Sequence, residues 1–392
     1  MELIYQNFDG LDVTFQGVVP DSILKQLEKG RQEAEDNSAR RSPAPALVML
    51  GKGGIPVHVA ESGMKGGFRY RLDTGPDGEV WFLANSDDPK GWNIRVSVKS
   101  LSLALYGYAG VKARIYAMLE NLEAKGSGEF NNKTGEIYDF PKEAISRVDY
   151  CFDFISEDFK INQEYLIAHS RCKKKDLLVQ EIISAGRNII YSRIGSMPNR
   201  QIVLYDKIRE IQEKHKSYWW KIWGIEKEEF NKKIWRIEVR AGKKELKNWN
   251  LRTFDDFENK IGDVILSILK VIKYVRPNLK DTNPNRWPLA PFWAGAQNAA
   301  GNALAEYISN AKRNPIIEDY REELENRYKN QIAGMIPAYA VIKGKDYAAH
   351  IPGVLEEFST EFSEDSQDKR EKIQNKMEKA KNKFVFLNKN DE

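Results

Sequence analysis

Alternating apolar and polar residues dominate the first 250 positions, and this period of two predicts β-strands. The clearest runs cover residues 11–15, 92–98, 145–154 and 234–239. Residues 68–72 and 79–83 flank the sequence Thr74-Gly75-Pro76-Asp77-Gly78, and this arrangement predicts a hairpin. Residues 188–191 and 201–205 predict a second pair of strands, joined by a turn at residues 195–199.

Apolar residues three and four positions apart predict helices, which are scattered before residue 250 and dominate after it. The expected helices cover residues 21–35, 110–125, 163–172, 208–216, 254–274, 293–308 and 317–336. From residue 361 onward the chain is rich in Lys and Glu and predicts a frayed helix. The change in pattern predicts an α+β domain over residues 1–250, a mostly helical region over 251–360 and a charged tail over 361–392.

The bulk composition narrows the class of protein. Hydrophobic residues make up 41% of the 392 positions, so most of the chain is expected to fold. The longest apolar runs are short, such as residues 264–269, and none approaches the roughly 20 residues that span a bilayer, so no membrane partner is expected. The first residues show no secretory signal, and Cys151 and Cys172 form no CxxC pair. These features favour a cytoplasmic protein without a disulfide scaffold or structural zinc.

Charge is distributed unevenly along the chain. Residues 171–247 hold 20 Lys and Arg against 10 Asp and Glu, so with a total of +4 the rest of the chain carries −6. Aromatic residues interleave this basic segment, and flat side chains among cations suit unstacked nucleic-acid bases. A solvated lysine-rich surface is the alternative. The candidate DNA-binding residues are Arg193, Lys173, Lys174, Lys175, Trp219, Trp220, Lys243 and Lys244.

Two of the predicted strands carry acidic residues at even spacing. Asp149 and Asp153 share one face of the first strand with an arginine two residues before Asp149. On the second strand Glu238 lies between Arg236 and Arg240, again on one face. Either these are outward polar faces with local ion pairs, or their carboxylates form a site for a hard cation.

Tyr205 is the candidate nucleophile. An apolar run places its phenol next to Asp206 and Lys207, and the two acid-bearing strands lie on either side of it in the sequence. A bound Mg²⁺ or Mn²⁺ would neutralise a phosphodiester, a cationic side chain would stabilise the transition state, and the tyrosine would attack phosphorus. The four histidines are scattered, so carboxylates would have to hold the metal. The simpler interpretation is a strand-end tyrosine beside an exposed ion pair.

Several motifs in this order resemble the Rep-trans family of rolling-circle replication initiators, with related filamentous-phage initiators and relaxases. They are Arg147-x-Asp149-x-x-x-Asp153, Tyr205-Asp206-Lys207-x-x-Glu210 and Trp235-Arg236-Ile237-Glu238. The resemblance covers roughly residues 10–250, and the tyrosine motif is the most specific part. It implies an antiparallel-sheet nicking domain flanked by helices, followed by a mostly helical C-terminal region.

The resemblance also implies roles for individual residues. Tyr205 would form a 5′-phosphotyrosyl bond and leave a free 3′-OH, with Lys207 and Arg200 holding the phosphate. Asp149 and Glu238 would bind Mg²⁺ or Mn²⁺, with Asp153 in support. Position 203, often arginine in the family, is valine here, so the charge would have to come from Arg200 or Arg193. Glu210 fits the motif without an assigned role, and Tyr191 is a rival nucleophile.

The implied partner is origin DNA, recognised as a duplex and nicked as a single strand, with a homodimer and a host helicase as further expectations. The origin could be that of a plasmid, a phage or a conjugative element. Two alternatives remain open: a non-catalytic origin-binding regulator, and a metal-dependent nuclease that uses water. The nicking hypothesis requires the Tyr205 phenol to lie beside the acid-bearing strands and outside the interior.

Overall fold

A computed structural model describes residues 1–38, 44–128, 130–131, 136–137, 139–168, 180–227, 230–278, 280–300, 304, 313–345, 348–368 and 370–387. The chain folds into two compact units. The first contains residues 1–214 and 219–311, and the second contains residues 215–218 and 312–392. The first unit is an α+β domain, and the described part of the second is mostly helical, so the predicted fold class is confirmed.

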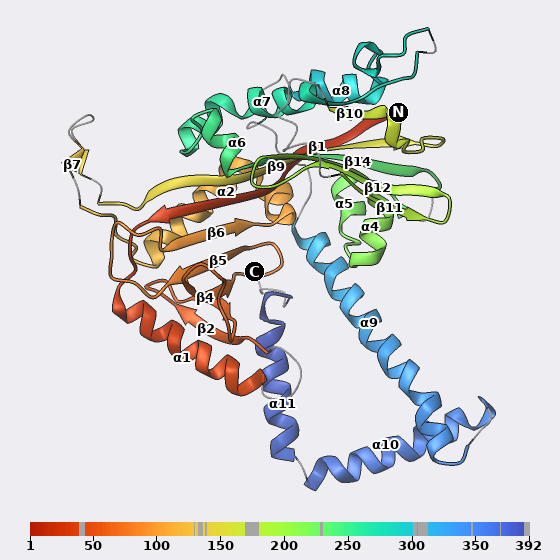
Figure 1. Cartoon of the computed structure of the whole chain (residues 1–392). Helices are drawn as coiled ribbons and strands as arrows, with labels where there is room; N and C mark the ends of the chain where they lie inside the picture. Colours follow the sequence, from red (N-terminus) through yellow and green to blue (C-terminus); the bar gives the residue numbers. More distant parts are fainter. Residues whose placement is uncertain are drawn as a thin grey trace. The chain divides into compact units, whose positions relative to one another are not determined.

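An antiparallel sheet of eleven strands forms the centre of the first unit (Figure 1). Its order is β11-β12-β13-β14-β9-β1-β6-β5-β4-β3-β2. The strands are β1 (Glu2–Gln16), β2 (Ala46–Leu50), β3 (Ile55–Val59), β4 (Phe68–Asp73), β5 (Glu79–Ala84), β6 (Ile94–Val98), β9 (Lys142–Ser156), β11 (Gln180–Ala185), β12 (Asn188–Gly195), β13 (Arg200–Asp206) and β14 (Lys233–Gly242). The predicted hairpin is β4–β5, and the predicted second pair is β12–β13.

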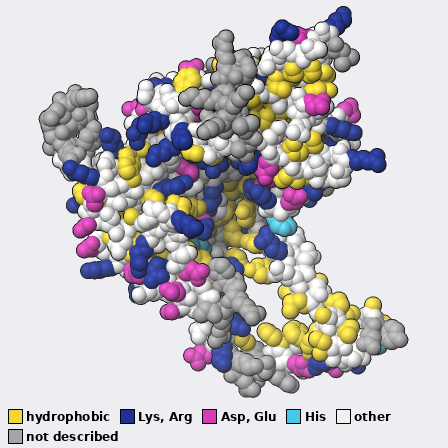
Figure 2. Space-filling view, in the orientation of Figure 1, with side chains coloured by type: hydrophobic (Ala, Val, Ile, Leu, Met, Phe, Trp, Pro, Cys, Tyr) yellow, Lys and Arg dark blue, Asp and Glu magenta, His cyan; other side chains and the backbone are white. Residues whose placement is uncertain are grey.

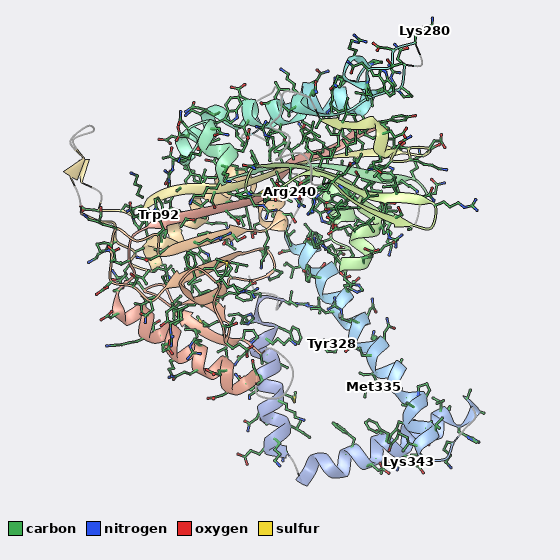
Figure 3. All side chains as sticks on the ribbon, in the orientation of Figure 1. Trp92, Arg240, Lys280, Tyr328, Met335 and Lys343 are labelled. Atoms are coloured by element: carbon green, nitrogen blue, oxygen red, sulfur yellow. The ribbon has the colours of Figure 1, made fainter. Side chains whose placement is uncertain are left out.

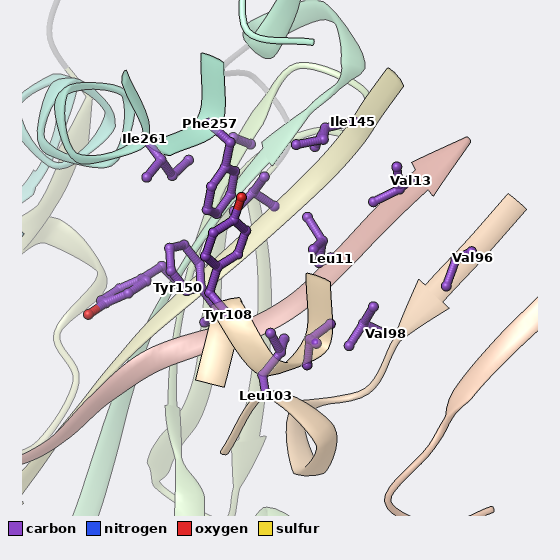
Figure 4. Packing of buried hydrophobic residues seen from close by; sticks show 14 of the residues in the cluster. Leu11, Val13, Val96, Val98, Leu103, Tyr108, Ile145, Tyr150, Phe257 and Ile261 are labelled. Carbon is purple, nitrogen blue, oxygen red and sulfur yellow. The ribbon is translucent and has the colours of Figure 1, made fainter. Parts of the chain in front are cut away.

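Helices cover one face of this sheet and complete the apolar core. They are α1 (Asp21–Ser38), α2 (Ser100–Asn121), α7 (Phe254–Val271) and α8 (Pro291–Ala300). The rings of Tyr108 from α2 and Phe257 from α7 stack at 4.5 Å between centroids, above Leu11 of β1 and Tyr150 of β9 (Figure 4). A capping box between Thr253 and Asp256 fixes the start of α7.

The opposite face of the sheet carries charged and polar side chains. Cross-strand partners point to the same side of a sheet, and the register pairs Arg240 with Asp149 and Tyr205 with Arg236. We call this side, defined by Arg147, Asp149, Glu238, Arg240 and Tyr205, the polar face. The short helices α4 (Lys207–Lys214) and α5 (Trp219–Trp223) follow β13 in the chain.

Smaller elements complete the first unit. They are β7 (Phe130–Asn131), β8 (Glu136–Ile137), β10 (Leu166–Ala168), β15 (Ile272–Tyr274), α6 (Lys243–Asn248) and the 3₁₀ turns η1 (Gln163–Tyr165) and η3 (Pro284–Arg286). The predicted helix over residues 163–172 is wrong in its described part. Asn162 caps only a 3₁₀ turn, after which Leu166 to Ala168 pair with β15. Backbone pairing with a distant strand therefore overrode the local pattern.

The second unit consists of α9 (Arg313–Ile342), α10 (Ile351–Asp368) and α11 (Arg370–Lys383), with 3₁₀ turns η5 (Ala348–His350) and η6 (Val385–Leu387). Several of its apolar side chains are exposed, including Ile332, Met335 and Ile342, and yellow patches mark this surface in Figure 2. Tyr339 of α9 packs edge-on against Phe358 of α10. No described helix of the chain is long and apolar enough to cross a bilayer.

Candidate active site

Tyr205 reaches the polar face because β13 alternates. Ile202 and Leu204 enter the apolar core, so Tyr205 points to the other side of the sheet. Its Oη donates a hydrogen bond to Glu238 Oε2 over 3.2 Å. Glu238 lies on the neighbouring strand β14, opposite Val203. The structure therefore brings the candidate nucleophile directly against one of the predicted acids.

The Tyr205 side chain is close to the acids but largely covered. The residue is 9% exposed and counts among the buried residues, so the expectation that its phenol lies outside the interior is wrong, although Tyr205 is not a member of the main apolar cluster formed by the described residues. Burial, followed by the negative charge of Glu238, raises the pKa of the phenol well above its ordinary value of 10.0. In this state Tyr205 is a neutral phenol, and a phosphodiester reaches Oη only after local movement of the residues around it.

A chain of hydrogen bonds fixes Glu238 in place. Arg240 donates from Nε to Glu238 Oε1 over 2.7 Å and from Nη1 to Gln201 Oε1 over 2.9 Å. Gln201 in turn donates from Nε2 to the carbonyl oxygen of Gly195. Figure 3 labels Arg240 on the sheet. Gln201 was missed in the sequence, although it lies four residues before Tyr205 and therefore on the same face of the strand.

Asp149 lies on the same face, one strand beyond Glu238. Arg147 binds its carboxylate twice, from Nε at 3.0 Å and from Nη2 at 2.6 Å. Burial raises the pKa of Asp149 to about 7, the negative charge of Glu238 adds to this effect, and Arg147 opposes it. Gly10 of β1 leaves the space for this carboxylate, because a Cβ at that position would lie 3.1 Å from Asp149 Oδ2.

The raised pKa of Asp149 leads to an expected pH dependence of stability. Between about pH 4 and pH 7 the folded chain holds a proton on Asp149 that the unfolded chain has lost. The free energy of unfolding therefore falls as pH rises, by about 1.4 kcal/mol per pH unit for one such group. We expect Asp149→Asn to be more stable, relative to the wild type, at pH 7.5 than at pH 4.5. Urea denaturation at both pH values measures this, and an equal difference at both would contradict it.

Asp153 has a different role from the one predicted. Its side chain is 0% exposed, and Arg236 donates to both of its oxygens at 2.6 and 2.7 Å. Trp223 Nε1 donates to the same carboxylate over 2.9 Å, and Arg236 Nη1 also binds Asp9 Oδ1 at 2.7 Å. The expectation that Asp153 supports a metal does not fit this geometry, because its oxygens are already engaged in a buried ion pair.

Lys207, predicted to hold the phosphate, and Trp219, predicted to bind DNA, are both buried. Lys207 is 2% exposed and binds Glu210 Oε2 at 2.7 Å, so its ammonium is not placed to hold a phosphate. Its Nζ lies 4.4 Å from the ring centroid of Trp219, while Arg236 Cζ lies 4.2 Å from the same ring. Trp219 is 0% exposed and therefore cannot stack on a base. This cluster explains Glu210, which had no assigned role, as the ion-pair partner of Lys207.

The remaining residues predicted to contact phosphate or DNA differ in their surroundings. Arg200 pairs with Glu245 at 3.0 Å, and Arg193 pairs with Glu181 at 3.1 Å. Lys243 and Lys244 are exposed at the start of α6, and Trp220 is half-buried against Trp223 and Phe230. Lys173, Lys174 and Lys175 lie outside the described residues.

The rival nucleophile Tyr191 is the direct cross-strand partner of Tyr205. The two ring centroids lie 6.4 Å apart. Tyr191 is half-buried, and burial raises the pKa of its phenol as well. Both phenols therefore belong to one part of the polar face, but only Tyr205 donates to Glu238.

The positions and charges of the carboxylates on the polar face show whether a metal ion would fit there. Among the described residues, no three His, Cys, Asp or Glu side chains come together as a ready-made metal site. Mg²⁺, however, is commonly bound by one or two carboxylates together with water and substrate phosphate. Asp149 and Glu238 are two buried acids whose charges repel, and a cation would relieve this repulsion. This pair fits such a cation, with Arg147 and Arg240 as the present counter-ions.

Comparison with known proteins finds one matching family model and a similar solved structure. Residues 103–260, which include β9, β12, β13 and β14, match the family model for the N-terminal part of a phage replication-associated protein. A solved structure of a rolling circle replication initiator protein from Geobacillus stearothermophilus is similar over 77% of this chain and 99% of its own, with 16% identity and a TM-score of 0.39. A comparison with curated proteins gives no match.

Proposed function

Since residues 103–260 match the family model of this phage replication-associated protein, we propose that this chain nicks one strand of origin DNA and so initiates rolling-circle replication. One observation carries the proposal: Tyr205 Oη donates to Glu238 Oε2 on a sheet face that also holds Asp149. A phenol that donates to a carboxylate beside a second acid is suited to attack on a phosphodiester.

In the proposed step, Tyr205 Oη forms a bond to phosphorus and its proton passes to Glu238 Oε2. The bond between phosphorus and the 3′ oxygen breaks, and that oxygen takes a proton from solvent to become a free 3′-OH. The product is a 5′-phosphotyrosyl ester on Tyr205. Attack by a 3′-OH on this ester reverses the step and rejoins the strand.

Asp149 and Glu238 are the residues we propose to hold Mg²⁺ or Mn²⁺. The bound cation would neutralise a phosphate oxygen and favour loss of the phenolic proton. The chain itself contributes Arg147 and Arg240, each beside one of these acids, to stabilise the negative charge that develops on phosphate. Arg200 and Arg193 are further phosphate contacts in this proposal, whereas Lys207 has a structural role.

Replacing Glu238 by Gln tests the proton acceptor. The amide keeps the shape of the side chain but is a far weaker base, so we expect the nicking rate to fall by about 10²- to 10⁴-fold. Single-turnover kinetics on labelled single-stranded origin DNA measure this loss. Gln201→Glu, which places a carboxylate elsewhere on the same face, is the matched control and should not restore activity when combined with Glu238→Gln.

A denaturing gel tests the proposal as a whole. The full chain is mixed with single-stranded origin DNA, labelled on the 3′ side of the nick, and Mn²⁺. Nicking by a tyrosine leaves the labelled piece attached to protein. Cleavage without attached protein would indicate a metal-dependent nuclease, and binding without cleavage would indicate an origin-binding regulator. The homodimer, the host helicase and a conjugative role stay predictions that rest on the resemblance alone.

A further inference from the structure

The polar face extends well beyond Tyr205. The register pairs Arg147 of β9 with Asp12 of β1, and Asp12 with Ser97 of β6. Arg95 of β6 lies two residues from Ser97 and therefore on the same face, and its partner on β5 is Phe82. One continuous surface thus connects the tyrosine on β13 to β5, through β14, β9, β1 and β6.

An ion pair holds Arg95 on this surface and leaves part of its guanidinium exposed. Its Nη2 binds Asp12 Oδ2 at 2.9 Å, and Ser97 Oγ donates to Asp12 Oδ1 over 2.7 Å. The Arg95 side chain is 32% exposed, while Asp12 is buried. Asp12 binds the guanidinium through Nη2, and Nε is covered and has no hydrogen-bond partner among the described residues, so a phosphate would contact the exposed part of the group. A partly exposed guanidinium held in this way is suited to a phosphate.

Phe82 adds a flat apolar surface next to this cation. It is half-buried, although its neighbours Trp81 and Leu83 point to the other side and enter the core. Its ring lies 6.4 Å from that of Phe68 on β4. An aromatic ring beside a partly exposed arginine is the arrangement on which proteins stack unpaired bases.

We propose that Arg95 and Phe82 form a binding site for single-stranded DNA, in which Arg95 contacts a phosphate and Phe82 stacks on a base. The inference rests on the proposed function, because it extends the DNA path away from the nick. Four strand spacings separate β13 from β6, about 19 Å across the sheet. Both residues precede the segment that matches the replication-associated family model, so this site belongs to the N-terminal part of the chain.

The experiment measures binding of fluorescein-labelled (dT)₂₀ to the full chain by anisotropy, over a range of salt and without divalent metal. We expect Phe82→Ala to weaken binding at least about fivefold. Arg95→Ala should weaken it and lower the slope of log K against log salt by about 0.7, the loss of one phosphate contact on a single strand. Arg286→Ala, which breaks an exposed pair with Asp281, is the matched control and should change neither quantity.

Asp12→Asn is the most discriminating variant, because we expect it to strengthen DNA binding, whereas Arg95→Ala and Phe82→Ala should weaken it. Removing the carboxylate frees Arg95, so (dT)₂₀ should bind about two- to fivefold more tightly if Arg95 contacts DNA. If Asp12 and Arg95 only support the fold, the variant should bind equally or more weakly. This variant decides the matter if Arg95→Ala fails to fold. Wild-type affinity and salt slope in Arg95→Ala, together with wild-type affinity in Phe82→Ala, would overturn the proposal.

These outcomes are separate from those for nicking. If Tyr205 is not the nucleophile, the denaturing gel shows no adduct, while the binding changes at Arg95, Phe82 and Asp12 still occur. If the chain does nick DNA but this site is wrong, the adduct forms and the three variants bind (dT)₂₀ like the wild type.

Discussion

Tyr205→Phe is expected to abolish nicking and covalent capture of DNA, with a loss of at least about 10³-fold in rate. The substitution removes only the oxygen that would attack phosphorus, and loss of a nucleophile commonly costs that much or more. The ring would still pack beside Tyr191, so binding of single-stranded DNA should remain close to that of the wild type. The measurements are relaxation of a supercoiled plasmid with the cognate origin and capture of labelled DNA on a denaturing gel.

Tyr191→Phe is the matched control, since the two tyrosines are cross-strand partners. It should keep the adduct, because Tyr191 does not donate to Glu238. Nicking that persists in Tyr205→Phe and disappears in Tyr191→Phe would transfer the role of nucleophile to Tyr191. Loss of nicking only in the double variant would mean that either phenol can attack.

Arg236→Ala is expected to lower the free energy of unfolding by about 3–5 kcal/mol. The Arg236 side chain is 0% exposed and forms ion pairs with Asp153, which is equally buried, and with Asp9. Removing the guanidinium leaves Asp153 as an uncompensated charge in the interior and removes a cation from the face of Trp219. Urea denaturation followed by tryptophan fluorescence measures the change.

The double variant Arg236→Met with Asp153→Asn provides the control. It removes both charges together and should recover a large part of the lost stability, because the cost comes from the unpaired acid. Arg286→Ala, which breaks an exposed pair, should have no measurable effect. A stable Arg236→Ala protein that no longer nicks DNA would instead indicate a direct role for Arg236 in the reaction.

The sequence was sufficient for elements whose pattern is local. The hairpin of β4 and β5 follows from a Gly-Pro-Asp-Gly turn between alternating strands, and the position of Tyr205 on the polar face follows from the alternation in β13. Helix α2 was placed only in part. It begins at Ser100 but has a non-helical break at Gly107, and the predicted start at residue 110 follows that break. Strands β2, β3 and β11 were not predicted.

The site was predicted less completely because burial and pairing depend on the whole sheet. Lys207 and Trp219 lie in a basic, aromatic segment whose composition is typical of a DNA-binding surface. Only their contacts with Arg236 and Glu210 show that they are interior residues. The same is true of Gly10. It leaves space for the Asp149 carboxylate only because β1 pairs with a strand more than 130 positions later in the chain. Local sequence patterns hold no information about such a pair.

The alternation of acids and arginines on the polar face has a kinetic consequence. Glu238, Asp149 and Asp12 are each bound to an arginine, so above about pH 7, where Asp149 is ionised, this surface is close to electroneutral when no DNA is present. Long-range attraction of a polyanion must then originate elsewhere, for example from the exposed Lys243 and Lys244. The arginines of the polar face would determine the dissociation rate of bound DNA, whereas the peripheral lysines would determine its association rate.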